Sequence, residues 1–358
     1  MKILAGVKSL HNILKQQSHY GARYFSTLSF HLNAKPRYCK LIMVASVNNN
    51  KFYEMIENGN VIDISYGRVG STAVKRTANV GQWYALISSK LKKGYVDVTE
   101  MSGTVVSGKG NDGRSSLFVN HHSEMVKDFL NQLNRYSNTS ISSNYTVTVQ
   151  NVTKEQVAKA QSIMDELFSN HLHNFNTTIE CVEEFNRKLL ELYAVIPRKM
   201  AQVREFLLQD TATKNEARKL LDNQQEILDV MATQVQISKQ DYNEEKNSNS
   251  EEVDFLTSSG LLVEEASNHD IEIIKRLMGP QNQHLLSRAF CVTNVKTQKE
   301  FDKWLTTKNN RKTDLFWHGS RNENFLSIMM NGLQLRPALN GRMFGHGNYF
   351  GKFTTIVI

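Results

Sequence analysis

Two neighbouring stretches near the end of the chain decide its fold: Leu315-Phe316-Trp317-His318-Gly319-Ser320-Arg321 and Asn340-Gly341-Arg342-Met343-Phe344-Gly345-His346-Gly347-Asn348-Tyr349-Phe350. The first reads as an apolar strand that ends in a histidine, a glycine and a hydroxyl side chain. A glycine at that point lets a flat ligand approach the backbone N–H and C=O groups without meeting a Cβ atom. The second concentrates glycines and aromatic side chains in a tight loop. Together they predict a binding site at the end of a strand.

Length and composition limit the class of protein. A chain of 358 residues with 40% hydrophobic and 22% charged residues is typical of a soluble protein with two or three domains. The longest apolar stretch, 41–47, is far shorter than a membrane-spanning helix, so we expect no membrane partner. The three cysteines, Cys39, Cys181 and Cys291, are too widely spaced to predict disulfides or a zinc site, and we expect no metal.

The net charge of +8 comes from the beginning of the chain. Residues 1–53 hold eight basic residues and no acidic one, which leaves 35 basic residues to balance 35 acidic ones. Residues 1–37 also combine serines with apolar residues at helical spacing, which resembles a mitochondrial transit peptide. The alternatives are a disordered leader or an upstream extension with the working start at Met43.

Residues 38–105 are predicted to form a small antiparallel β domain that carries a local positive charge. The alternating runs 52–56 and 61–66 flank Asn58-Gly59, a pair that favours a hairpin turn in which both central residues take positive φ. A helix is predicted near 82–91. A region without any acidic residue holds six basic ones, a pattern that fits a surface following a phosphate backbone better than an ordinary solvated face: Arg68, Lys75, Arg76, Lys90, Lys92 and Lys93.

Residues 122–237 are predicted to form an all-α bundle without a catalytic cluster. Thr153 and Gln156 have the spacing of a capping box, and an apolar helical face follows them. The acidic residues of this region read as solvated helix faces. Further helices are predicted over 125–133, 179–192 and 217–235.

Two segments are predicted to connect these bodies. Residues 106–121 are rich in glycine and lack the spacing of a phosphate-binding loop, so we interpret them as a linker. Residues 238–256 are acidic and rich in asparagine and serine, and they lack the apolar spacing needed to pack. The last body, 257–358, contains the two motifs quoted first.

Three parts of the chain, in the family's own domain order, resemble the poly(ADP-ribose) polymerase (PARP) family. Tyr66-Gly67-Arg68-Val69-Gly70, followed by Lys92-Lys93-Gly94-Tyr95, resembles the WGR domain, although Tyr66 stands where that domain has tryptophan. Residues 152–156 and 192–197 resemble segments of the helical regulatory domain. The paired motifs resemble the N-terminal part of the ADP-ribosyltransferase catalytic domain. The resemblance implies an α+β multidomain fold with an antiparallel β WGR domain, an all-α bundle and an incomplete mixed α/β catalytic domain.

The same resemblance implies that the last body binds NAD+, as a substrate. His318 would hold the hydroxyl of the nicotinamide-side ribose, and Gly319 would bind the nicotinamide carboxamide through its backbone. Ser320 and Arg321 would lie towards the adenosine half. Tyr349 would form part of the nicotinamide pocket wall and, with His318, belong to the catalytic set.

The WGR-like part implies binding of DNA ends or breaks. Tyr66 could stack on a base or sugar, and the six basic residues named above could contact phosphates. The other interpretation is that Tyr66 is a core aromatic. The helical part, by resemblance, restrains access of NAD+ until DNA binds.

The sequence departs from the family pattern after Phe350. Gly351-Lys352-Phe353-Thr354-Thr355-Ile356-Val357-Ile358 stands where the family has a Ser-Lys-Ser segment and, later, a catalytic glutamate. Glu323 is too close to His318 along the chain to replace that glutamate. From this we expect a fragment or truncated gene product that is inactive alone.

The function predicted for the parent protein is DNA-responsive transfer of ADP-ribose from NAD+ to protein acceptors, with release of nicotinamide. The alternatives are a catalytically dead DNA-binding adaptor and a plain interaction protein in which His318 is structural. The family resemblance implies the nucleus, whereas the basic leader favours the mitochondrion.

Overall fold

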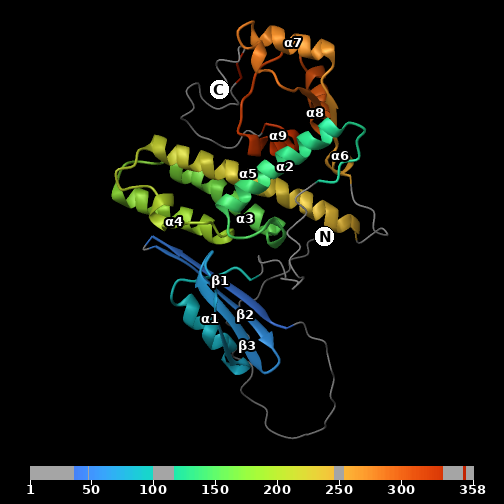
Figure 1. The fold of residues 1–358 in the computed structure, drawn as a ribbon. Helices are drawn as coiled ribbons and strands as arrows, with labels where there is room; N and C mark the ends of the chain where they lie inside the picture. The colour runs from blue at the N-terminus through green and yellow to red at the C-terminus, as the bar shows by residue number, and fades with distance from the viewer. Residues whose placement is uncertain (1–35, 47, 100–116, 246–253, 334–349, 352–358) are drawn as a thin grey trace, which may run out of the picture. The chain divides into compact units, whose positions relative to one another are not determined.

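The computed structural model describes residues 36–46, 48–99, 117–245, 254–333 and 350–351, with the side chains of 239–245 left aside. Residues 37–358 cluster as one compact unit, and the predicted leader lies almost entirely outside the described residues. Figure 1 follows this unit from an N-terminal sheet, through a set of long helices, to a smaller group of helices and strands near the C-terminus. The fold is α+β, in agreement with the class predicted from the sequence.

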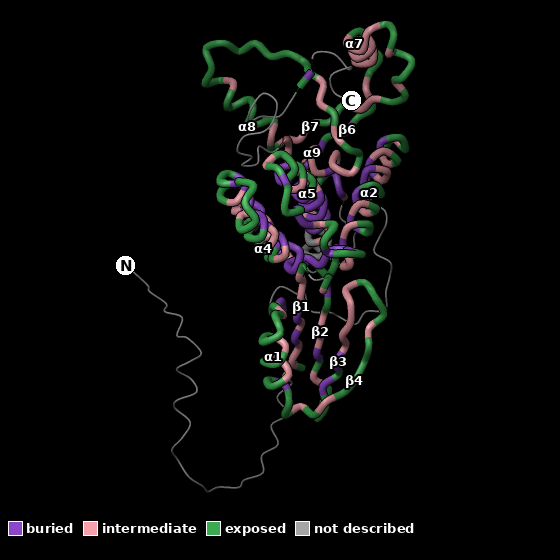
Figure 2. Tube along the Cα trace, turned by 90° about the vertical axis from the view of Figure 1, so that its left-hand side faces the viewer, coloured by how far each residue is buried: buried purple, intermediate pink, exposed green. Residues whose placement is uncertain are grey.

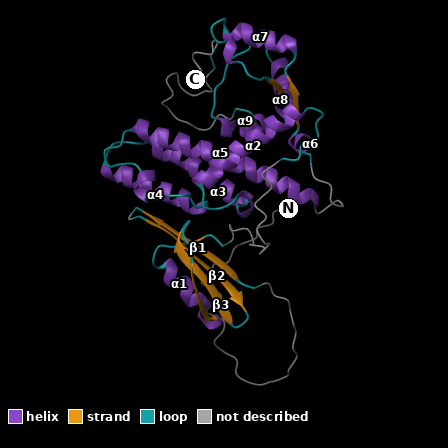
Figure 3. Ribbon diagram, in the orientation of Figure 1, coloured by secondary structure: helices purple, strands orange, loops and turns teal. Residues whose placement is uncertain are grey.

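The N-terminal sheet is antiparallel and five-stranded. Its strands have the spatial order β4-β3-β2-β1-β5. The strands are β1 (Tyr38–Ala45), β2 (Asn49–Asn58), β3 (Val61–Arg68), β4 (Val74–Asn79) and β5 (Val96–Asp97). The 3₁₀-helix η2 (Val80–Gln82) leads into α1 (Trp83–Leu91), which lies across one face of the sheet (Figure 3). Alternation along β2 and β3 sends Tyr53, Met55, Ile62 and Ile64 into the core beneath Trp83.

The predicted hairpin between β2 and β3 forms, but its turn differs from the prediction. Asn58 pairs with Val61, so the two loop residues are Gly59 and Asn60 rather than Asn58 and Gly59. Gly59 has a φ of +62°, and among the described non-glycine residues only Asn48 takes a positive φ. A turn with positive φ at its first central position is of the type II′ kind, which matches the twist of the flanking strands as well as the predicted turn does.

Four long helices form the middle of the unit. The predicted capping box is present: the Thr153 hydroxyl accepts from the Gln156 N–H, and the Gln156 side chain accepts from the Thr153 N–H. Burial is continuous along these helices (Figure 2), and the largest side chains enclosed among them are Phe168, Phe185 and Tyr193. The helices are α2 (Glu124–Asn144), α3 (Lys154–Glu166), α4 (Ile179–Val195) and α5 (Lys214–Glu245), with the 3₁₀-helices η3 (Val149–Asn151) and η5 (Val203–Phe206).

Two features of these helices go beyond the sequence prediction. A π-helical segment, η4 (Leu167–Leu172), continues the chain directly after α3. Helix α5 extends to Glu245, into the segment 238–256 that was predicted as a linker. Among the described residues no helix is both long and apolar enough to cross a bilayer.

The C-terminal elements share a core with the long helices. Strands β6 (Leu261–Glu265) and β7 (Phe290–Asn294) form an antiparallel pair, and Gly332 ends the last described helix with a φ of +72°. Leu261 and Val263 of β6 join one apolar cluster with Val126 and Leu130 of α2. The helices are α6 (Phe255–Ser259), α7 (Asn268–Met278), η6 (Gln283–Leu285), α8 (Val295–Thr306), η7 (Asn322–Asn324) and α9 (Phe325–Asn331).

Candidate functional site

The structure brings the ends of the two C-terminal motifs together. Trp317 donates its N–H to the carbonyl of Gly351 at 2.8 Å, and Gly351 donates back to the carbonyl of Trp317 at 3.0 Å. The ring of His318 lies 5.6 Å from the ring of Phe350 between centroids. Tyr349 and the loop 342–347 lie outside the described residues. The strand predicted over 315–321 is not formed: Trp317 makes only an isolated bridge, to Gly351, two residues after Tyr349.

The backbone around His318 is accessible. His318 and Ser320 are half-buried, whereas Gly319 between them is exposed. The Ser320 hydroxyl accepts a hydrogen bond from the Asn324 side chain at 3.2 Å, which fixes its position at the start of η7. An exposed glycine backbone beside an imidazole and a hydroxyl supplies hydrogen-bonding groups that a flat amide and a sugar can reach.

Arg321 is held by the long helix α5. Its guanidinium donates to the carboxylate of Glu226 in a short contact, and to the Asn223 side chain at 3.2 Å. Glu323 lies on the other side, with its carboxylate 3.8 Å from Nε of Arg321. The residue predicted to face the adenosine half of NAD+ is thus engaged by two carboxylates.

Sequence reasoning missed Glu226 and Asn223 as members of this site. They precede Arg321 by nearly a hundred residues, and the acidic residues of the bundle were interpreted as solvated. No spacing rule connects positions so far apart. The only available signal was that a polar side chain of α5 that is covered by another part of the chain needs a hydrogen-bonding partner there.

A second candidate surface lies on the N-terminal sheet, where aromatic rings surround a lysine. The Lys90 ammonium lies 4.2 Å from the centroid of the Tyr53 ring, 5.3 Å from Tyr95 and 5.9 Å from Tyr66. Arg76 donates to the Tyr53 hydroxyl at 2.9 Å. These cation–π contacts hold the ammonium in a defined place on the sheet.

The positive charges of this surface influence one another. Burial is the main cause that lowers the pKa of Lys90, and the neighbouring cations Lys93, Arg76 and Lys51 lower it further. A bound anion stabilises a group of cations that otherwise repel one another. The arrangement therefore favours binding of a phosphate group at this surface. Tyr66 is half-buried and packs partly against the sheet core, in line with the core-aromatic interpretation, whereas its stacking on a base or sugar stays a prediction.

The predicted basic residues do not all share this surface. In the strand register, Lys75 stands opposite Ser65, whereas Arg76 stands opposite the buried Ile64. The side chains of Lys75 and Arg76 therefore point to opposite faces of the sheet. Lys92 follows the last residue of α1, and its N–H caps that helix.

Arg68 is engaged in contacts with the helical part of the unit. Its guanidinium donates to the Ala201 carbonyl at 2.7 Å and to the Met200 carbonyl at 3.3 Å. It also donates to the backbone carbonyl and the side-chain oxygen of Asn48. Most donors of Arg68 are therefore already used inside the unit, and its predicted contact with phosphate stays a prediction.

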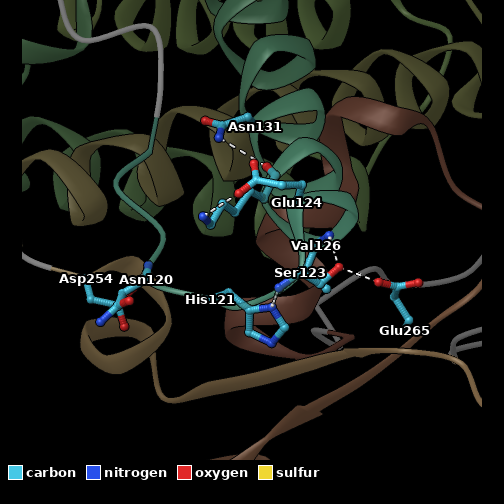
Figure 4. A network of polar contacts seen from close by, with 9 residues as sticks. Asn120, His121, Ser123, Glu124, Val126, Asn131, Asp254 and Glu265 are labelled. Carbon is cyan, nitrogen blue, oxygen red and sulfur yellow. Dashed lines mark hydrogen bonds and ion pairs between the residues drawn. The ribbon is translucent and has the colours of Figure 1, made fainter.

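A network of polar contacts joins the residues before α2 to the strand β6 (Figure 4). The Asn120 N–H donates to Asp254 at 2.8 Å, and the Ser123 hydroxyl makes a short contact with Glu265. His121, His122 and Glu264 in the same place have the donor types of a metal site.

His121 contacts both the segment before α2 and the strand β6. Its Nδ1 accepts from the Ser123 N–H at 3.0 Å, and its Nε2 lies 3.6 Å from the Glu264 carboxylate. We interpret the group as a polar contact between β6 and the segment before α2.

Comparison with known proteins shows what parts of this chain are similar to. Residues 268–356 match the family model of the poly(ADP-ribose) polymerase catalytic domain. The chain is 31% identical over 239 residues to the uncharacterized protein 101L of Invertebrate iridescent virus 6, which covers 66% of this chain and 92% of that protein.

Two further relatives carry informative names. The putative poly [ADP-ribose] polymerase-like protein 100L of the same virus is 30% identical over 95 residues, 25% of this chain and 51% of that protein. The poly [ADP-ribose] polymerase of Sarcophaga peregrina is 25% identical over 214 residues, 57% of this chain but only 20% of that protein. The C-terminal quarter of the chain thus matches the PARP catalytic domain, and a larger part of the chain is similar to protein 101L.

Proposed function

We propose that the protein is a DNA-responsive ADP-ribosyltransferase, which transfers ADP-ribose from NAD+ to protein acceptors and releases nicotinamide. The observation that carries this proposal is the backbone pairing of Trp317 with Gly351, because it joins the two motifs that the family uses to bind NAD+. The match of residues 268–356 to the PARP catalytic domain supports the same conclusion.

In this proposal the residues around His318 bind and orient NAD+. The His318 imidazole holds a hydroxyl of the nicotinamide-side ribose, and the exposed backbone of Gly319 binds the carboxamide. Cleavage of the bond between nicotinamide and ribose builds positive charge on the sugar. Groups fixed before the reaction stabilise such charge without reorganising, so the bridge between Trp317 and Gly351, next to His318, would contribute to the rate.

The enzyme proposal predicts NAD+ binding that depends on His318. Because the residues after Phe350 depart from the family pattern, the test on this chain measures binding of NAD+ rather than turnover. His318→Ala is expected to weaken NAD+ binding about tenfold or more. Tyr136→Ala, at an exposed position of helix α2, serves as the control and is expected to bind as the wild type does. Equal affinity of the wild type and His318→Ala, or no NAD+ binding by either, would overturn the proposal for this chain.

We further propose that the N-terminal sheet is the WGR-like part that binds DNA ends or breaks. The support is the positive surface formed by Arg76, Lys90 and Lys93 beside Tyr66. Phosphates would neutralise cations that now repel one another. The Lys75 side chain points to the other face of the sheet and would contribute less to phosphate binding.

This part of the proposal is tested by the salt dependence of DNA binding. Replacing Lys92 and Lys93 by alanine is expected to reduce the slope of log affinity against log salt by roughly 1.8, since each lost phosphate contact removes about 0.9. Lys75→Ala is the control and is expected to change the slope much less. A double variant with an unchanged slope would remove the proposed phosphate surface.

The middle helices would then act as the regulatory part. The contact of Glu226 and Asn223 with Arg321 supports a closed state in which α5 occupies a residue needed by NAD+. Binding of DNA would have to weaken this contact to open the site. The free energy of the contact would then set the size of the coupling between DNA binding and NAD+ binding.

A further inference from the structure

Helix α8 and the residues after it form a surface that the proposed function leaves unused. From its exposed aromatic rings and its unpaired positive charges, we propose that this surface binds single-stranded nucleic acid. It is separate from the proposed NAD+ site and from the N-terminal sheet. We name it the α8 surface and define it as residues 295–312.

The aromatic part of the α8 surface is a pair of stacked rings. Phe301 and Trp304 are 43% and 52% exposed, which is unusual for such large apolar side chains one helical turn apart. Their ring centroids are 6.0 Å apart, with an angle of 26° between the planes. The Lys308 ammonium lies 4.9 Å from the centroid of the Trp304 ring. The two exposed rings therefore stack on each other, and a cation lies over the face of the Trp304 ring.

The charges of the α8 surface are strongly unbalanced. Only Glu300 and Asp302 oppose six basic residues, and none of the six forms an ion pair within the described part of the chain. Apart from residues 1–53 the chain is balanced in charge, so this local excess is a feature of α8 and the segment after it. The six are Lys296, Lys299, Lys303, Lys308, Arg311 and Lys312.

Flat rings among cations fit a ligand that carries both bases and phosphates. Aromatic side chains bind unpaired bases by stacking, and lysines beside them follow the phosphates of the strand. A duplex hides the faces of its bases within the helix, so it could not use Phe301 and Trp304 in this way. The exposed rings therefore favour a single strand over a duplex.

The experiment uses the full chain with Lys92→Ala and Lys93→Ala, which reduces the contribution of the N-terminal sheet to binding. The probe is a short fluorescent oligothymidine, and its binding is followed by fluorescence anisotropy. Phe301→Ala combined with Trp304→Ala is expected to weaken binding about tenfold or more. Lys299→Ala combined with Lys303→Ala is expected to lower the salt slope by roughly 1.4.

Two more variants keep the test decisive if the double ring variant fails to fold. Trp304→Phe keeps an aromatic ring and is expected to retain most of the affinity, whereas Trp304→Leu keeps an apolar side chain and is expected to lose it. Tyr136→Ala is the control for an exposed aromatic residue elsewhere. The proposal fails if Trp304→Leu binds oligothymidine as well as the parent does. It also fails if a DNA duplex or an ADP-ribose polymer displaces the probe at lower concentration than unlabelled oligothymidine.

Discussion

The Arg321 side chain shows how one residue can be shared between two parts of a chain. Its guanidinium is about half exposed, and so is the carboxylate of Glu226 that it contacts. An ion pair in such a position contributes roughly 0–1 kcal/mol to stability, because water screens it. The pair therefore matters little for folding, but it decides whether Arg321 is available to a ligand.

Removing the carboxylate of Glu226 should free Arg321 for NAD+. Glu226→Gln is expected to raise the affinity for NAD+ about fivefold in the absence of DNA, and to reduce the further gain caused by DNA. The free energy of unfolding is expected to change by less than about 1 kcal/mol. Calorimetric titration with NAD+ and urea unfolding measure the two quantities.

The matched control is Glu272→Gln, which removes one carboxylate of an exposed ion pair with Lys275 on α7. This variant is expected to leave NAD+ affinity unchanged. If Glu226→Gln behaves like the control in both titrations, α5 does not restrain the site through Arg321.

At the scale of the elements, Asp254 links the start of the C-terminal part to the segment before α2. It caps α6 by accepting from the Thr257 N–H at 3.0 Å, and it also accepts from the Asn120 N–H at 2.8 Å. Burial alone would raise the pKa of Asp254, but the hydrogen bonds from Thr257 and Asn120 outweigh it and lower the pKa. The charged form is therefore favoured by folding.

The stability contributed by Asp254 should depend on pH in a defined direction. Because its folded pKa is lowered, the contribution is complete above the pKa of the unfolded chain, near 4, and is lost as the pH falls through the folded value. Asp254→Ala is expected to cost about 1 kcal/mol at pH 7, as for other helix caps, and less at pH 3. Urea unfolding at both pH values measures the difference.

Glu183→Ala, at an exposed position of α4, is the control for a lost carboxylate. It is expected to change stability by less than about 0.5 kcal/mol at either pH. A cost for Asp254→Ala that is the same at pH 3 and pH 7 would contradict a role for the ionised cap.

Elements were predictable where the signal lies in a few consecutive residues. The capping box of Thr153 and Gln156 and the stop at Gly332 depend only on local backbone chemistry, so the sequence could locate them. The hairpin was predicted, but not which residues form its turn. Gly59 can occupy either central position, and the pairing of Asn58 with Val61 settles the choice. The π-helix η4 had no local signal, since it arises within an uninterrupted helical sequence.

At the scale of the whole molecule, the candidate site was only half predictable. The motifs around His318 and Tyr349 predict a ligand-binding site because glycine, imidazole and hydroxyl groups stand next to each other along the chain, but the strand predicted at His318 is reduced to one bridge. The engagement of Arg321 by Glu226 depends on how α5 packs against η7, and that of Arg68 depends on the carbonyls of 200–201. Such long-range contacts follow from tertiary packing, which periodicity does not encode.

The central claim is that the segment of His318 and the segment of Tyr349 line a single site for NAD+. The most direct measurement is calorimetric titration of NAD+ into the full chain, His318→Ala, Tyr349→Ala and Tyr136→Ala, all carrying Glu226→Gln so that Arg321 is free. We predict that His318→Ala and Tyr349→Ala each weaken NAD+ binding about tenfold or more, whereas Tyr136→Ala binds as the parent does. Parent-like binding by either His318→Ala or Tyr349→Ala would contradict a shared site.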